Sequence, residues 1–181
     1  NFYVSPRPLF ALACNSSHYV ALDWTMQEAV RAVDGALDRV VAAVGGHMHW
    51  FQGLAFVDSA LPVQLVVGNG GTKLLDAAAG FASHAFPELY VPNAPGVPGG
   101  QARVRDGVSK VAFGYTRMAR NAGAYLAEAI AVTEGGKFWD VEIPTGPRRC
   151  PPGCEPEPGA SAKQSGGRRL LFASTPVGSC P

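Results

Sequence analysis

An apolar run followed by two glycines constrains the fold of this chain more than any other feature. Val40–Val44 is continuous in apolar residues, and its length favours a strand that is buried on both faces. A Thr-x-x-Glu capping box at Thr25 predicts that a helix starts before this run. Its apolar residues recur at three- and four-residue steps, which predicts an amphipathic helix with one apolar face, formed by Met26, Ala29, Val30, Val33 and Leu37. Phe2–Ser5 is typical of a short buried strand that ends at Pro6. Strand, helix and strand in this order predict a βαβ unit with parallel strands.

The rest of the chain alternates between strand-like segments and turns. Five further strands are predicted, at Leu54–Val57, Val63–Val67, Val108–Arg117, Ala124–Val132 and Phe138–Ile143. Glycine, proline and small polar residues predict loops or turns at Ala11–Asp23, Gly68–Thr72, Val91–Asp106 and Glu134–Lys137. These elements predict an α/β (α+β) fold.

Composition separates a folded part from a tail. Residues 1–143 hold every predicted element, and a chain of 181 residues is long enough for one domain. Pro144–Pro181 is rich in Pro, Gly, Ser and Arg, which predicts a mostly disordered tail. The formal net charge is +1 and the basic residues are scattered, so we expect no nucleic-acid partner. No stretch reaches the roughly 18 apolar residues of a membrane span.

Two histidines follow the central apolar run. His47 and His49 are one residue apart, and Gly46 before them permits the backbone to turn both side chains toward one point. Neutral imidazole is a good ligand for Zn, Fe, Mn or Ni. Loops at the carboxyl ends of parallel strands are where open α/β sheets place their sites. The alternative is one histidine in core packing and one at the surface.

The context of this pair resembles a known family. Val40–Gln52, a buried strand that runs into Gly-His-x-His, resembles the last signature of the calcineurin-like metallophosphoesterases, and Val66–Thr72 resembles the strand and glycine turn that follow in many of them. Phe113–Tyr115 and the turn at Gly136 and Lys137 are similar to the end of that domain. The resemblance spans Phe2 to Ile143. It implies a two-layer β-sandwich with flanking helices, metallo-dependent phosphatase-like, of which this chain is the C-terminal half.

The resemblance also implies a chemistry. His47 would ligate the second and His49 the first of two divalent or trivalent transition-metal ions (Fe, Zn or Mn), whose bridging water or hydroxide attacks phosphorus in a phosphate ester. In the purple acid phosphatase branch a loop histidine contacts the phosphate or protonates the leaving group, and His18 is similar in placement. Phosphomonoesters are the expected substrates. The alternative for His18 is an exposed loop residue.

The sequence departs from the family pattern in two places. Where the family has a metal-binding histidine after its equivalent of Phe2–Ser5, this chain has Pro6, which cannot coordinate a metal. The upstream Asp-x-His, Gly-Asp-x-x-Asp and Gly-Asn-His-Asp/Glu signatures are absent. The chain starts at Asn1 inside an apolar strand, so we expect it to be part of a larger protein whose N-terminal half supplies them. The chain alone is expected to be inactive.

Two alternatives stay open. The first is a catalytically decayed relative that serves as a binding or scaffold module, favoured by Pro6. The second is a secreted interaction protein with disulfides, because Cys14, Cys150, Cys154 and Cys180 make an even count. The compartment stays open, with secretion and the vacuole as alternatives. The glycine turn at Gly68–Thr72 lacks the spacing of a phosphate-binding loop and is interpreted as structural.

Overall fold

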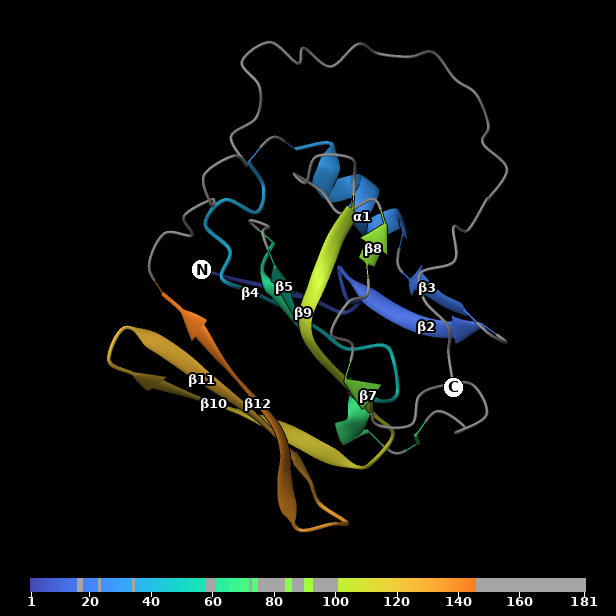
Figure 1. Ribbon diagram of the computed structural model, residues 1–181, viewed down its shortest axis with the longest axis vertical. Helices are drawn as coiled ribbons and strands as arrows, with labels where there is room; N and C mark the ends of the chain where they lie inside the picture. The colour runs from blue at the N-terminus through green and yellow to red at the C-terminus, as the bar shows by residue number, and fades with distance from the viewer. Residues whose placement is uncertain are drawn as a thin grey trace.

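Three parallel strands form one end of a seven-stranded main sheet (Figure 1). The computed structural model describes residues 1–15, 18–22, 24–33, 35–57, 61–71, 73–74, 84–85, 90–92 and 101–145. Strand β1 (Phe2–Ser5) pairs in parallel with β4 (Ala42–Gly45), which pairs in parallel with β6 (Val63–Val67). The predicted parallel pairing of the first strand with the central apolar strand is therefore confirmed. The sheet continues through antiparallel strands β5 (Phe51–Val57), β9 (Gln101–Lys110), β7 (His84–Ala85) and β8 (Tyr90–Pro92).

A second sheet packs on one face of the main sheet. It consists of three antiparallel strands, β10 (Gly114–Asn121), β11 (Ala124–Ala131) and β12 (Gly136–Pro144), which cross beside the main sheet in Figure 1. Trp139 of this sheet shares a core cluster with Phe51 and Leu65 of the main sheet. A Cβ atom at Gly53 would lie 2.4 Å from the Trp139 ring, so glycine is what leaves room for the indole.

The opposite face of the main sheet is covered by a helix and a hairpin. Helix α1 (Trp24–Arg31) packs Met26 and Val30 against a second core cluster that contains Leu12 and Leu54. The hairpin consists of β2 (Ala11–Asn15) and β3 (His18–Leu22), whose antiparallel register runs from Ala11↔Leu22 to Asn15↔His18. The main sheet is therefore the middle layer, and its central strands are buried on both sides.

Two buried glutamines of the central strands bind the backbone that leads into the hairpin. The Gln64 Oε1 atom accepts hydrogen bonds from the N–H groups of Leu9 at 3.0 Å and Phe10 at 2.9 Å. Its Nε2 atom donates to the backbone carbonyls of Ala43 and Leu65, both at 3.1 Å.

The second glutamine, Gln52, accepts from the Leu12 N–H at 2.8 Å and donates to the Leu12 carbonyl at 2.9 Å. Its Nε2 atom also donates to the Ser109 hydroxyl at 2.6 Å, which links the contact to β9. Because buried backbone groups must be paired, these amides take the place that a neighbouring strand would fill.

The predicted loop at Ala11–Asp23 is wrong, because most of it forms the β2–β3 hairpin. Residues 16, 17 and 23 lie outside the described residues. The apolar segment that enters the hairpin, including Leu9 and Leu12, is fully buried. This segment is extended because it is buried and because the side-chain amides of Gln52 and Gln64 bind its backbone. The local Pro and Ser residues indicated a loop instead.

The predicted loop at Val91–Asp106 is also wrong over its described part. Residues 91–92 belong to β8 and residues 101–106 to β9, whereas residues 93–100 lie outside the described residues. The strand predicted at Val108–Arg117 is two strands, since β9 ends at Lys110 and β10 begins at Gly114. Between them the chain passes from the main sheet to the second sheet.

The helix is shorter than the apolar pattern predicts. It ends at Arg31, and Gly35 has a positive φ of 67° that interrupts any continuation toward Leu37. Val33, which the pattern places on the buried face, is 60% exposed. Met26 and Val30 of the helix pack against the core, and Leu37 packs against the same cluster from outside the helix.

The positions of the other predicted strands agree with the structure, but Phe2–Ser5, predicted to be buried, alternates between exposed and half-buried residues. The strand at Val63–Val67 is confirmed, and the strands at Ala124–Val132 and Phe138–Ile143 correspond to β11 and β12. Pro144, predicted to start the tail, belongs to β12, and the Thr145 N–H donates to the Gly123 carbonyl at 3.0 Å. Residues 146–181, with Cys150, Cys154 and Cys180, lie outside the described residues.

The fold class is confirmed in its coarse form. The described residues form mostly β structure in sheets, and α1 is the one α-helix among them, fewer than the expected flanking helices. No helix within the described ranges is long and apolar enough to cross a membrane.

We predict that Gln64→Leu destabilises the fold although leucine is more apolar. The substitution leaves the buried N–H groups of Leu9 and Phe10 without their acceptor, and each such group costs about 1–3 kcal/mol. We expect the free energy of unfolding to fall by about 2 kcal/mol or more in urea denaturation. An unchanged free energy would mean that this segment is held by its apolar side chains alone.

Candidate functional site

The carboxyl ends of β1, β4 and β6 meet at one edge of the main sheet, because the three strands are parallel. Three segments leave the sheet there, starting at Pro6, Gly46 and Gly68. We call this the carboxyl edge. It carries His47 and His49, the two residues predicted to bind metal.

The three segments pack backbone against backbone. A Cβ atom at Gly45 would lie 2.5 Å from the Cα of Pro8, and one at Gly68 would lie 1.6 Å from the Met48 carbonyl oxygen. Real Cβ atoms cannot approach so closely, so glycine is required at both places if the backbones are to stay in contact. Gly68, part of the turn interpreted from sequence as structural, thus contacts the backbone of the histidine loop directly.

His47 occupies an unusual backbone conformation. Its φ is +66°, one of two positive φ values among the described non-glycine residues. The Met48 N–H donates to the Gly46 carbonyl at 2.7 Å, which closes a three-residue γ-turn centred on His47. Positive φ in a non-glycine residue is energetically unfavourable, and such conformations cluster at functional sites.

The turn separates polar from apolar side chains. His47 and His49 are exposed, whereas Met48 between them packs against the core cluster on the helix side of the sheet. Trp50 is only 2% exposed. Met48 and Trp50 therefore anchor the loop, and both imidazoles are left accessible to solvent at the carboxyl edge. This excludes the alternative in which one histidine belongs to the core.

Pro6 lies next to this loop. Its carbonyl oxygen is 3.5 Å from the Cβ position of Gly46, the residue before His47. The position where the family would have a further histidine ligand is thus adjacent to the histidine pair in space, as the parallel pairing of β1 and β4 requires.

The third predicted site residue, His18, is the first residue of β3 and pairs with Asn15 across the hairpin. Its side chain lies outside the description. The structure therefore brings His47 and His49 onto one loop. The expected role of His18, to contact the phosphate or protonate the leaving group, stays a prediction.

Asn69 is a residue at this edge that sequence reasoning missed. It is almost fully buried in the short 3₁₀ helix η1 (Gly68–Gly70), and its Nδ2 atom donates to the Ala112 carbonyl at 3.1 Å. This bond joins the glycine turn to the connection between β9 and β10. The Asn69 Oδ1 atom is buried without a hydrogen-bond partner. Only the glycines on either side marked the position in the sequence.

The three segments that form the carboxyl edge carry few charged side chains where the structure describes them. Residues 5–8, 45–50 and 67–71 include Arg7 and the two histidines and no Asp or Glu. Within the described residues, no three His, Cys, Asp or Glu side chains lie together as a metal-binding group. Imidazole is a suitable ligand for a transition metal, but two imidazoles alone provide too few ligands for a metal site.

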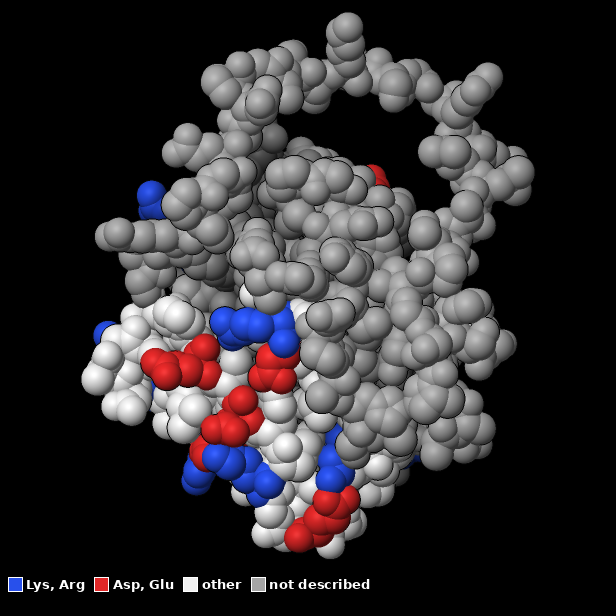
Figure 2. Space-filling model, viewed as in Figure 1, with Lys and Arg blue, Asp and Glu red and all other residues white. Residues whose placement is uncertain are grey.

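Charged residues gather instead on the outer face of the second sheet, where acidic and basic side chains alternate (Figure 2). The Arg117 guanidinium donates to the Glu128 carboxylate at 2.6 and 2.9 Å, and this hydrogen bond raises the pKa of Arg117. Lys137 lies 3.7 Å from Glu128 and 3.2 Å from Asp140. Because the two signs are interleaved, this face lacks the single-sign patch of a nucleic-acid site.

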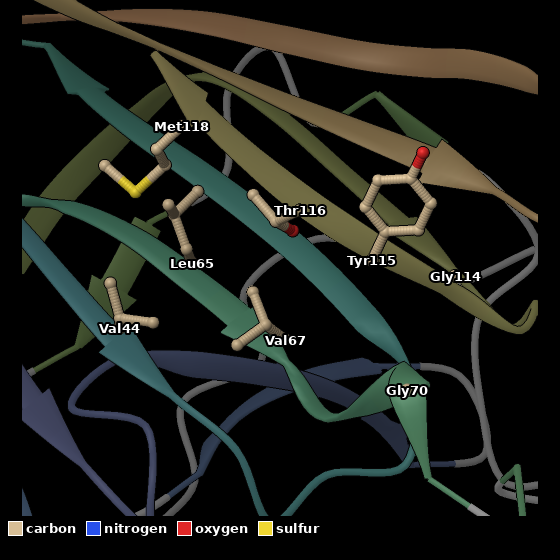
Figure 3. Close-up of a pocket in the computed structure, with 8 residues that line it drawn as sticks. All are labelled: Val44, Leu65, Val67, Gly70, Gly114, Tyr115, Thr116 and Met118. Carbon is tan, nitrogen blue, oxygen red and sulfur yellow. The ribbon is translucent and has the colours of Figure 1, made fainter. Parts of the chain in front are cut away.

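A mostly apolar groove opens between the two sheets (Figure 3). Its volume is about 270 Å³, and it is lined by Val44, Leu65, Val67, Gly70, Gly114, Tyr115, Thr116 and Met118. The Thr116 hydroxyl is buried and has no hydrogen-bond partner. The groove has no titratable group other than the Tyr115 phenol, so its lining offers no metal ligands.

No family model, curated protein or solved structure matches this chain.

We predict that Gly68→Ala displaces the histidine loop. The new methyl group would clash with the Met48 carbonyl, and we expect a loss of about 1–3 kcal/mol in the free energy of unfolding. The imidazole NMR signals of His47 and His49 should shift with it. Gly71→Ala is the matched control, because its Cβ position is 3.9 Å from the nearest atom and its φ is −81°. Equal effects of the two substitutions would contradict the close approach.

Proposed function

We propose that this chain is the C-terminal half of a metal-dependent phosphoesterase domain that hydrolyses phosphate esters. The observation that carries the proposal is the γ-turn at His47, which exposes two imidazoles on one loop while Met48 and Trp50 anchor it. Positive φ at an exposed non-glycine residue is energetically unfavourable, and such conformations cluster at functional sites, which supports a role in binding.

The arrangement of the strands supports the proposal. The histidine loop follows β4, the strand between β1 and β6, and the glycine turn after β6 lies directly against it. That order agrees with the calcineurin-like pattern on which the expectation rested. The packing of the second sheet on the main sheet is compatible with half of a two-layer β-sandwich of the metallo-dependent phosphatase type.

The residues at the edge fit part of a metal site. His47 and His49 would hold transition-metal ions such as Fe, Zn or Mn, and the carboxylate ligands would come from the N-terminal half of the domain. Two such ions lower the pKa of a bound water and offset negative charge in the transition state. This chain would contribute the position of the loop that carries the two imidazoles, since the contact at Gly68 limits the movement of its backbone.

The proposed substrates are phosphomonoesters. Arg7, His47 and His49 lie on the segments of the carboxyl edge, and basic and neutral side chains of this kind favour an anionic substrate there. His18 would contact the phosphate or protonate the leaving group, as the resemblance implies.

A catalytically decayed relative, serving as a binding or scaffold module, is the second candidate. Pro6 favours it, because this residue lies beside Gly46 at the position of an expected ligand and has no donor side chain. A protein of this kind would keep the fold and lose one of the two metals.

We predict that His49→Ala removes metal and activity together in the protein encoded by the complete gene. Loss of a direct ligand should exceed the 10–100-fold effect typical of residues that only support a ligand, so we expect kcat/KM for p-nitrophenyl phosphate to fall by more than about 100-fold. Metal content by mass spectrometry should fall in parallel. His84→Ala, on strand β7 of the same sheet, is the matched histidine control.

Unchanged metal content in His49→Ala would refute the ligand assignment. A wild-type protein that carries no metal and does not hydrolyse the ester would instead support the decayed relative.

A further inference from the structure

An apolar surface extends from the groove between the two sheets onto strand β1. Val44 lines the groove and pairs in register with Val4, so both side chains lie on the same face of the main sheet. Val4 is 75% exposed. Phe2, on the same face, contacts the Tyr125 ring of the second sheet with the ring centroids 5.0 Å apart. The apolar lining of the groove therefore continues beyond Val44 to exposed Val4.

The wall of the groove that β10 forms is also incompletely covered. Met118 pairs with Ala127, which is fully buried in the core between the sheets, so Met118 faces inward, although it is 37% exposed. Figure 3 shows Val44 and Val67 of the main sheet facing Thr116 and Met118 across the opening. The described residues thus leave an apolar space of about 270 Å³ unfilled.

The two strands beside this opening are edge strands. Strand β1 is the first strand of the main sheet, and β10 is the first strand of the second sheet. An edge strand presents unpaired backbone groups on its outer side. An extended apolar segment in the groove would therefore find backbone partners as well as apolar contacts, which is how peptides commonly add to sheets.

The sequence beyond Thr145 contains a segment that suits this groove. Leu170–Ala173 is Leu-Leu-Phe-Ala, the only run of aliphatic and aromatic residues in residues 146–181. The residues around it are mostly Gly, Pro, Ser and Arg, a composition that offers little else to bury. Burial of leucine and phenylalanine side chains strongly favours association, so this run is the part of the tail with most to gain from an apolar groove.

The chain passes residue 145 at one end of β10. The Thr145 N–H donates to the carbonyl of Gly123 at 3.0 Å, and Gly123 lies in the turn between β10 and β11. Strand β10 has eight residues and spans about 26 Å. Residues 146–169 separate Thr145 from the apolar run, and a flexible chain of this length has an r.m.s. end-to-end distance of about 27 Å. Tethered binding is most favourable when these two lengths match.

We propose that Leu170–Ala173 docks as an extended segment in the groove between Val4 and Met118 of the same chain. Side chains alternate in an extended segment, so Leu170 and Phe172 point together into the groove. Arg168 and Arg169, which precede the run, stay in solvent. The proposal does not depend on the proposed phosphoesterase function.

The same segment of a second copy is a weaker competitor for the groove. A short flexible tether gives an effective concentration in the millimolar range, which exceeds the concentration of a second copy in dilute solution. Docking within one chain is therefore expected to be independent of protein concentration.

The first test uses methyl NMR of the 181-residue chain, which has three methionines. Met118 lines the groove, whereas Met26 and Met48 pack against the core cluster on the helix side of the sheet. Phe172→Ser removes the aromatic ring from the docked segment, so we expect the Met118 methyl signal to shift and the other two to stay. Val177→Ser, in the same tail but outside the apolar run, is the matched control and should shift none of them.

The second test changes the groove instead of the tail. Val4→Lys places a charge at an exposed position beside the groove, so the fold should tolerate it. We expect the amides of residues 170–173 to exchange at least about 10-fold faster in this variant than in the wild-type chain. Val132→Lys is the control, because Val132 is 62% exposed and does not line the groove.

A synthetic peptide of residues 166–175 distinguishes an occupied groove from an empty one. It should shift the Met118 signal in Phe172→Ser and leave it unchanged in the wild-type chain, where the tail already fills the groove. Equal shifts in both proteins would show an empty groove and overturn the proposal.

Two other results would also overturn it. The first is a Met118 signal that Phe172→Ser leaves unchanged. The second is a contact between Met118 and Phe172 that disappears on dilution, because the groove would then hold the tail of a second copy.

Discussion

The fold depends on two side-chain amides that replace backbone pairing on the face of the main sheet. Gln52 and Gln64 are fully buried, and together they satisfy the backbone of Leu9, Phe10 and Leu12. Without them, this segment would bury unpaired N–H groups against an apolar layer, which is more costly than losing an exposed hydrogen bond. By fixing the segment that follows Pro8, they also fix the course of the chain beside the histidine loop.

Local sequence patterns were sufficient to predict the strands that are formed by a short run of apolar residues. Val40–Val44 and Val63–Val67 could be recognised because a strand buried on both faces is nearly continuous in apolar residues, with Gln64 as the one exception here. Strand β9 could not, since residues 103–106 include Arg103, Arg105 and Asp106, and of residues 104–106 only Val104 is buried. Its pairing with β5, more than 40 residues earlier in the chain, determines its structure, and no short window of sequence contains that contact.

The candidate site was predictable in its residues but not in its geometry. A histidine pair after a buried strand indicated the loop, whereas the γ-turn at His47 and the contact between Gly68 and Met48 depend on three strands coming together. The glycines beside Asn69 marked only a turn, because the side chain donates a hydrogen bond to a carbonyl 43 residues away that no local pattern indicates. Sequence identifies side chains that can bind, but the backbone approach that orients them is set by tertiary structure.

The incomplete ligand set follows from the way the sheet places its loops. In a parallel sheet all strands end at the same edge, so each additional parallel strand adds potential ligands there. Three parallel strands end at this edge, and among the described residues their loops bring together two imidazoles but no group of three metal ligands. A complete metal site would therefore need ligands from further segments that end at the same edge.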